Sequence, residues 1–114
     1  MKVSLRDFRL TVTPARVPAG WVSMDLSNEG PDTHEMIIVR TAAGDGRLPL
    51  RLDGITADED ALAARKVDSA DTVLPGTRRT LRVHLEPGRY EVFCNMAGHY
   101  RAGMHTELVV VVPS

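Results

Sequence analysis

The sequence contains a single cysteine, Cys94, and therefore cannot form a disulfide within the chain. It has no apolar run approaching the roughly 18 residues that a membrane-spanning helix needs. It also has no long run of lysine or arginine, and its formal net charge is only −1. These absences exclude a disulfide-stabilised scaffold and predict a chain without a membrane span. They also argue against a partner that is a nucleic acid.

The overall composition is that of a soluble globular protein. Hydrophobic residues make up 43% of the 114 residues and charged residues 25%, which predicts one domain over residues 1–114. The segment Met1–Leu10 alternates like a strand and lacks the apolar core of a signal peptide. We expect that a signal peptide has been removed from the natural protein.

Most of the chain has the hydrophobic pattern of short β-strands. Apolar and polar residues alternate in several segments, and turn-forming Pro and Gly residues stand between them. The segment 34–40 is apolar on both parities, which is typical of a strand buried on both faces. The segments 3–10, 21–26 and 81–85 alternate, and 89–93 and the largely apolar 107–112 are further predicted strands. Six or seven such strands predict an all-β fold, an antiparallel β-sandwich.

The middle of the chain, residues 42–76, is different because it is rich in Gly, Asp and Ala. Thr56 and Glu59 have the spacing of a capping box, in which each side chain satisfies a free backbone N–H at a helix start. We therefore predict one short helical insertion around residues 57–66, of two to three turns. Its apolar residues are mostly alanine, so we expect a lid on the sandwich rather than a partner-binding helix.

A loop between the last two predicted strands carries three potential metal ligands. Cys94, His99 and Met104 are separated by four residues each, and Gly98 and Gly103 allow the loop to fold back. A lone cysteine is usually a buried packing residue, and a lone methionine usually belongs to the core. Thiolate and thioether are soft donors and imidazole binds both copper oxidation states, so this combination indicates copper.

A copper centre of this kind needs a second imidazole, and three other histidines are present. His84 lies mid-strand on the parity of Arg82 and is predicted to face solvent. His105 follows Met104 directly and should point the opposite way. His34 opens the buried strand after a turn and can point into one end of the sandwich. The predicted metal ligands are therefore His34, Cys94, His99 and Met104.

The sequence resembles the cupredoxins, the family of small blue copper proteins that includes plastocyanin and azurin. The matching pieces are Asp32–Met36, Gly88–Cys94 and the loop from Cys94 to Met104, and the loop is nearest to sulfocyanin-like bacterial cupredoxins. Plastocyanin-like proteins often have Asn directly after the first His ligand, where this chain has Glu35. The side-chain tie between the ligand loops is thus in doubt, although the backbone N–H of Glu35 could still donate to the Cys94 sulfur.

The resemblance implies a Greek-key sandwich, an extracytoplasmic location and one type 1 (blue) copper ion. In this arrangement two imidazoles and one thiolate form a plane, with a weak axial thioether from Met104. We expect an electron-transfer protein rather than an enzyme, because no metal position is left for substrate. The alternatives are a copper storage or delivery protein, a type 1 copper domain cut from a larger oxidoreductase, and a copper-free interaction module.

The expected partners are redox proteins that dock near His99 and Tyr100, on a protein that acts as a monomer. Small and apolar residues around a ligand imidazole would let such a partner approach closely. The residues expected to contribute are Pro31, Met36, Met96, Ala97 and Tyr100, although Met36 fits the core better.

Overall fold

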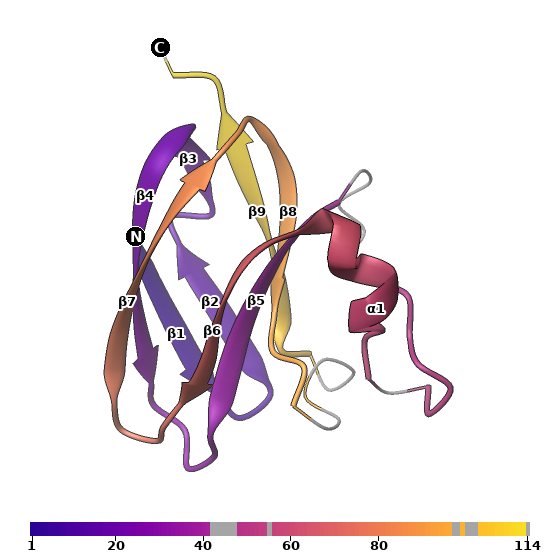
Figure 1. Ribbon diagram of the computed structural model, residues 1–114. Helices are drawn as coiled ribbons and strands as arrows, with labels where there is room; N and C mark the ends of the chain where they lie inside the picture. Colours follow the sequence, from indigo (N-terminus) through magenta and orange to yellow (C-terminus); the bar gives the residue numbers. More distant parts are fainter. Residues whose placement is uncertain (42–47, 55, 97–98, 100–102, 114) are drawn as a thin grey trace.

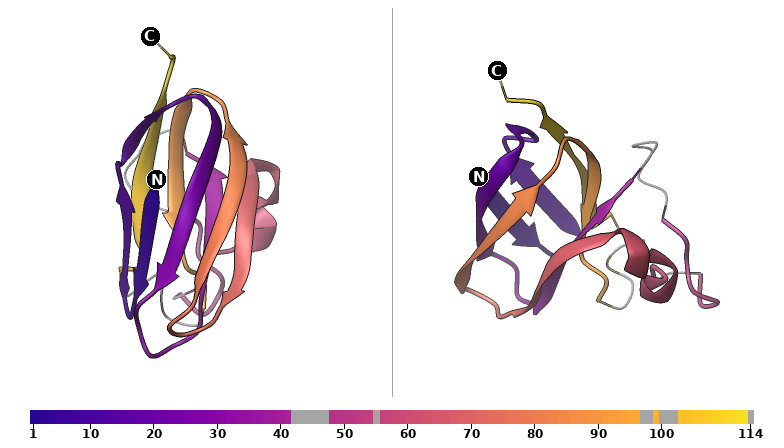
Figure 2. Two further views of the ribbon diagram at one scale, coloured as in Figure 1. Left: turned by 90° about the vertical axis from the view of Figure 1, so that its left-hand side faces the viewer. Right: turned by 45° about the horizontal axis from the view of Figure 1, so that its top comes forward.

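The computed structural model describes residues 1–41, 48–54, 56–96, 99 and 103–113. In this part of the chain, strands form two sheets that pack face to face, as predicted (Figures 1 and 2). The four-stranded sheet has the order β2 (Arg9–Thr13), β1 (Lys2–Arg6), β4 (Gly20–Asn28), β7 (Arg78–Leu85). The five-stranded sheet has the order β3 (Arg16–Pro18), β9 (His105–Val111), β8 (Gly88–Phe93), β5 (His34–Arg40), β6 (Lys66–Val73).

The sequence predicted an antiparallel sandwich, but the sheets are not purely antiparallel. Strand β1 runs parallel to β4, and β3 runs parallel to β9. The chain crosses between the sheets after β2, β3, β4, β6 and β7, which gives the Greek-key connectivity. In the five-stranded sheet, two pairs of consecutive strands are antiparallel neighbours: β5 with β6, and β8 with β9.

The first predicted strand is in fact a hairpin. Strands β1 and β2 pair from Lys2↔Thr13 to Arg6↔Arg9, and Asp7 and Phe8 form the turn between them. Phe8 has a φ of 65°, a left-handed conformation that is uncommon for a residue other than glycine. The sequence contains a sign of this turn, because the apolar alternation changes parity between Leu5 and Phe8.

The main core lies between the two sheets and is formed by their inward-facing side chains. Fully burying one aliphatic or aromatic side chain contributes roughly 1.5–3 kcal/mol, so this layer dominates the stability of the sandwich. Cys94 and Met104 belong to it, and neither has any exposed surface. Other buried members are Val3, Leu5, Met24, Leu26, Met36, Ile38, Tyr90, Val92 and Leu108.

The helical insertion is shorter than predicted and is capped by a different residue. Helix α1 covers only Glu59–Leu62, and a 3-10 turn, η1, continues it over Ala63–Arg65. The N-cap is Asp58, whose carboxylate accepts the N–H of Ala61, whereas the Thr56 hydroxyl donates to Asp53. The predicted capping box from Thr56 is therefore wrong.

The second half of the insertion is a strand, which the sequence pattern did not predict. Residues Lys66–Val73 form β6, the edge strand that pairs with β5. The helix before it lies beside the five-stranded sheet (Figure 1). Leu62 of the helix and Ala57 just before it form a second buried cluster with Ile37, Val39 and Phe93. This second cluster explains why the segment 34–40 is apolar on both parities.

Strand β6 contains a bulge directly opposite the residue after His34. His34 pairs with Val73 and Met36 with Ala70, so Asp71 and Thr72 together face one residue of β5. Thr72 has a φ of 54°, which strains its β-branched side chain.

Replacing Thr72 with asparagine is expected to stabilise the protein by about 1 kcal/mol, because asparagine tolerates the left-handed conformation better. Urea unfolding of the metal-free protein measures the change. Thr11→Asn, in the regular strand β2, is the matched control and should be neutral or destabilising. A loss of stability in Thr72→Asn would contradict the strain argument.

No helix in the described part of the chain has the length and apolar composition needed to cross a bilayer. The turns β1–β2, β4–β5 and β6–β7, the end of β8 and the start of β9 all lie at the same end of the sandwich (Figure 1). The predicted ligands come from this end.

Candidate metal centre

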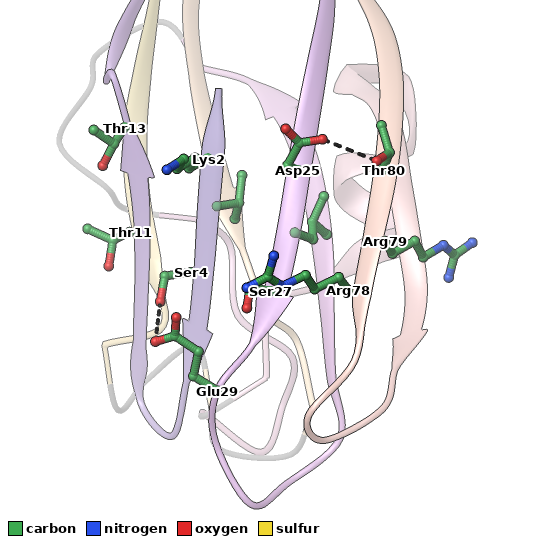
Figure 3. Close-up of a pocket in the computed structure, with 12 residues that line it drawn as sticks. Lys2, Ser4, Thr11, Thr13, Asp25, Ser27, Glu29, Arg78, Arg79 and Thr80 are labelled. Atoms are coloured by element: carbon green, nitrogen blue, oxygen red, sulfur yellow. Dashed lines mark hydrogen bonds between the residues drawn. The ribbon is translucent and has the colours of Figure 1, made fainter.

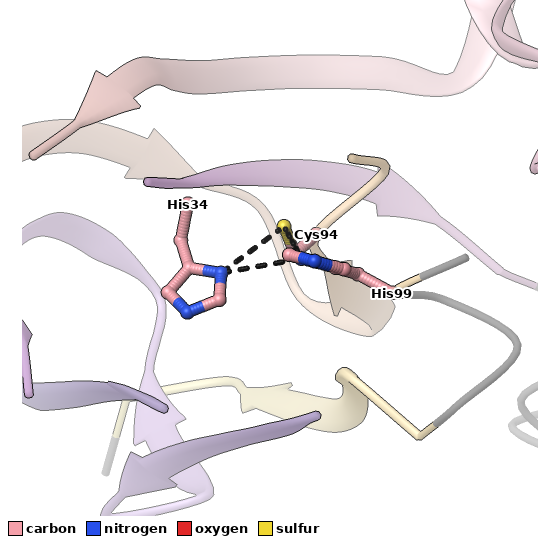
Figure 4. Close-up of side chains that lie close together, drawn as sticks. All are labelled: His34, Cys94 and His99. Carbon is pink, nitrogen blue, oxygen red and sulfur yellow. Dashed lines mark hydrogen bonds between the residues drawn. The ribbon is translucent and has the colours of Figure 1, made fainter. Parts of the chain in front are cut away.

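Two neighbouring strands bring together donors that are far apart in the sequence. His34 is the first residue of β5, and Cys94 directly follows β8. Strands β5 and β8 are antiparallel neighbours, with Ile37 opposite Phe93, so the start of one lies beside the end of the other. His99 lies in the loop after Cys94, and its imidazole faces the other two side chains (Figure 4).

The three donor atoms form a nearly regular triangle. The His34 Nδ1 to His99 Nδ1 distance is 3.3 Å, and the Cys94 Sγ lies 3.5 Å from His99 Nδ1 and 3.9 Å from His34 Nδ1. A point equidistant from these atoms lies about 2.1 Å from each of them, the circumradius of the triangle. Metal–nitrogen and metal–sulfur bonds are about 2.0 and 2.3 Å long, so a metal ion fits in this plane without movement of the side chains.

The donors are removed from solvent. His34 and Cys94 have no exposed surface, and His99 is 9% exposed. Burial raises the pKa of the Cys94 thiol, so the thiol must lose a proton when a metal binds. Burial and the neighbouring His99 lower the pKa of His34, outweighing the opposite effect of Asp7. His34 is thus a neutral imidazole at neutral pH, the form that binds metals.

Met104 is attached by its backbone to the other ligands of the loop. Its N–H donates to the carbonyl of His99 at 3.0 Å, and its own carbonyl accepts the N–H of Cys94 at 3.0 Å. The side chain is fully buried. These bonds place Met104 beside Cys94 and His99.

The other two histidines lie elsewhere. His84 is exposed on the four-stranded sheet, where its ring contacts Trp21 with centroids 5.3 Å apart. The Nδ1 of His105 lies 2.8 Å from the carboxylate of the buried Glu91. Within the described residues, the cluster of His34, Cys94 and His99 is the only group of three metal-binding side chains.

Glu35 connects the segment of His34 to the segment of Cys94, a connection that the sequence did not settle. Its backbone N–H donates to the Cys94 sulfur at 3.5 Å. Its carboxylate accepts the backbone N–H of Asn95 at 3.1 Å, so a glutamate connects the two ligand segments. Burial raises the pKa of Glu35, and the negative charge of Glu59 adds to this effect.

Asn95 extends this connection to the helical insertion. Its side-chain oxygen accepts the N–H of Ala57 at 2.8 Å, and its amide nitrogen donates to the Ala57 carbonyl at 3.0 Å. The same nitrogen donates to the carboxylate of Glu59 at 2.8 Å. The insertion therefore braces the residue that follows Cys94, a role that its composition did not reveal.

Sequence reasoning missed two residues that contact the histidines from the β1–β2 turn. The Nε2 of His34 lies 3.1 Å from the Asp7 carboxylate. The ring of Phe8 stands edge-to-face against the ring of His99, with centroids 5.5 Å apart and an interplanar angle of 86°. The change of parity between Leu5 and Phe8 could have indicated the turn, but not what it contacts.

The residues expected around the His99 edge are only partly described. Pro31 is exposed and Met96 is 39% exposed, whereas Met36 is fully buried in the core. Phe8, which was not predicted to be there, is 52% exposed. Ala97 and Tyr100 lie outside the described residues.

A hollow of about 600 Å³ lies on the outer face of the four-stranded sheet (Figure 3). Polar and charged side chains from β1, β2, β4 and β7 line it, among them Lys2, Thr11, Asp25 and Arg78. None of its lining residues is a predicted ligand, so it is separate from the metal-binding cluster.

Comparison with known proteins identifies the fold. No protein-family model matches the sequence, and no curated protein matches it. A reduced auracyanin from Roseiflexus castenholzii is 19% identical with a TM-score of 0.71, covering 96% of this chain and 94% of that chain. Auracyanin A, a "blue" copper protein from Chloroflexus aurantiacus, is also 19% identical, with a TM-score of 0.68 and 96% of each chain covered.

An azurin from Methylomonas sp. strain J is 13% identical with a TM-score of 0.63, covering 100% of this chain and 97% of that chain. The chain therefore has the cupredoxin fold, as the resemblance implied. One copper ion fits the donor set, because a thiolate and two imidazoles surround a point at metal-bond distance.

Proposed function

We propose that the protein is an electron carrier that binds one type 1 copper ion through His34, Cys94 and His99, with Met104 as the axial ligand. The triangle of buried donors, 3.3–3.9 Å on its sides, is the observation that supports it. When bound, copper supplies a one-electron couple between Cu(II) and Cu(I). A reduced protein partner provides the electron, and an oxidised partner receives it.

The chain holds the metal ligands rigidly and shields them from water. Neighbouring strands hold His34 and Cys94, and the N–H of Glu35 donates to the sulfur. Because the donors are already placed around a common point, little has to move when the metal gains or loses an electron. Burial excludes water that would otherwise take a coordination position.

These features favour a carrier over an enzyme or a copper-delivery protein. Four donors from the chain leave no position for a substrate. Delivery requires that a partner reach the metal and exchange ligands with it, yet His34 and Cys94 are fully buried and His99 nearly so.

Electron transfer requires that a partner approach the ligands closely. His99 is the one ligand of the described triangle with exposed surface, and the exposed side chains of Phe8 and Met96 are apolar. We propose that redox partners dock here, near His99 and Tyr100, on a monomer outside the cytoplasm.

Adding one equivalent of Cu(II) to the metal-free protein tests the function directly. An intense blue colour that ascorbate bleaches is expected, with one copper bound per chain. Absorption spectroscopy and metal analysis measure both. A colourless or pale product, or binding without a reducible chromophore, would rule out the type 1 site.

Replacing Met104 with leucine should retain the copper and raise the reduction potential. The axial ligand tunes the potential, so loss of the thioether should shift the Cu(I)/Cu(II) ratio about tenfold or more towards Cu(I). Redox titration measures the shift. Met24→Leu, an equally buried methionine in the core, is the control and should leave the potential unchanged. Complete loss of copper from Met104→Leu would contradict an axial role.

A further inference from the structure

We propose that Asp7 is a positioning residue of the copper site, which fixes the His34 imidazole for metal binding and lowers the reduction potential through its negative charge. This inference rests on the proposed function. It assigns to the β1–β2 turn a role that lies outside the ligand set.

Asp7 contacts the ring nitrogen of His34 that faces away from Cys94 and His99. The Nε2 of His34 lies 3.1 Å from Asp7 Oδ1, while Nδ1 of the same ring faces Cys94 and His99. His34 has no exposed surface, so water does not compete for Nε2. Asp7 is therefore the group that decides which hydrogen-bonding role this nitrogen takes.

The turn that carries Asp7 is held against the segment that carries His34. Strands β1 and β4 pair in parallel up to Leu5↔Asn28, and the N–H of Glu29 donates to the Leu5 carbonyl. Gly30 then passes so close that a Cβ on it would lie 2.8 Å from Asp7 Oδ1 and 3.0 Å from the Asp7 nitrogen. Asp7 is thus confined by the backbone that leads to His34.

The first consequence is a fixed tautomer. A carboxylate only accepts hydrogen bonds, so the neutral His34 ring must carry its proton on Nε2. Its Nδ1 then presents a lone pair to the point between the three donors. Groups that orient a ligand histidine in this way typically improve metal affinity 10–100-fold.

The second consequence is electrostatic. Asp7 places a negative charge one imidazole ring away from the metal, which favours Cu(II) over Cu(I). The side chain of Asp7 is 28% exposed, so solvent screens this effect only in part.

The same turn also contacts the second histidine, through the edge-to-face packing of Phe8 on His99. Gly103 of the ligand loop also lies close to Phe8, because a Cβ added to this glycine would be 3.4 Å from the Phe8 carbonyl oxygen. These contacts anchor the turn at the ligand loop and give Asp7 a defined position.

The tautomer is tested in the metal-free protein, independently of copper. Nitrogen-15 NMR of the imidazoles should show His34 protonated on Nε2 alone. Asp7→Asn keeps an oxygen acceptor and should retain this tautomer, whereas Asp7→Ala should give a mixture. An unchanged single tautomer in Asp7→Ala would overturn the positioning role.

The electrostatic and affinity effects are tested with copper. Asp7→Asn should remain blue but shift the Cu(I)/Cu(II) ratio about tenfold towards Cu(I), or about 59 mV for one electron. Asp7→Ala should in addition bind Cu(II) at least about tenfold more weakly in competition with a chelator.

Asp32→Asn is the matched control. Asp32 is exposed and close enough to interact electrostatically with His34, but no hydrogen bond joins the two among the described residues. It should leave the tautomer and the Cu(II) affinity unchanged and move the potential less than Asp7→Asn does. Equal effects from Asp7→Ala and Asp32→Asn on affinity would overturn the proposal.

The two hypotheses fail in different ways. If the unaltered protein does not turn blue with Cu(II), the proposed function fails, while the NMR result still decides the role of Asp7 in orienting His34. If the protein is blue and all three variants match it in potential and affinity, only the role of Asp7 is wrong.

Discussion

Replacing Cys94 with serine is expected to abolish the intense blue absorption and to weaken Cu(II) binding by at least about 100-fold. Even the loss of a group that only orients a ligand costs 10–100-fold, and Cys94 supplies one of the three in-plane donors. A serine hydroxyl is a harder donor and remains protonated in a buried site. Absorption spectroscopy and competition with a chelator measure the two effects.

The substitution should leave the fold intact. Serine is of similar size, and the N–H of Glu35 and the Nδ1 of His99, both 3.5 Å from the sulfur, can hydrogen-bond its hydroxyl. Circular dichroism of the metal-free variant checks this. A Cys94→Ser protein that is folded and still blue would disprove thiolate coordination and with it the electron-transfer proposal.

Replacing Asn28 with alanine is expected to lower the free energy of unfolding of the metal-free protein by about 3 kcal/mol. Asn28 is 2% exposed, and its amide nitrogen donates to the carbonyls of Asp32 and Val73, both at 2.8 Å. Its side-chain oxygen accepts the N–H of Gly30 at 3.1 Å. Each lost hydrogen bond costs about 1 kcal/mol, and more where a buried partner stays unsatisfied.

The neighbouring substitution Ser27→Ala is the control for Asn28→Ala. Ser27 faces the outer hollow of the four-stranded sheet, so its loss should change stability by less than about 0.5 kcal/mol. Denaturant unfolding of both variants gives the comparison. A loss below about 1 kcal/mol in Asn28→Ala would show that this residue does not brace the segment before His34.

Patterns within a few residues of each other were enough to predict most of the architecture. Alternation in segments such as 21–26 and 81–85 predicted strands, because one face of each meets the core and the other meets solvent. Cys94, His99 and Met104 could be recognised together because they share one loop. His34 could be selected because it opens a strand that is apolar on both parities.

Several features could not be predicted because they depend on contacts between distant segments. Strand β6 has weak alternation and exists through its pairing with β5, so its sequence suggested only a polar insertion. The parallel pairings β1–β4 and β3–β9 leave no local pattern. The helix ends early because the chain must return to the sheet edge at Lys66.

The sequence by itself determined the donor chemistry and the strand-rich scaffold, since side-chain identity and local periodicity are properties of the chain alone. Only the tertiary structure decided how the donors are arranged, how Glu35 and Asn95 connect the ligand loops, and that Asp7 reaches the far side of His34. Those contacts span 27 to 60 residues. The Asp7–His34 contact exists because two packed sheets bring their turns to one end of the molecule, and the Glu35–Asn95 contact exists because β5 and β8 are neighbouring strands.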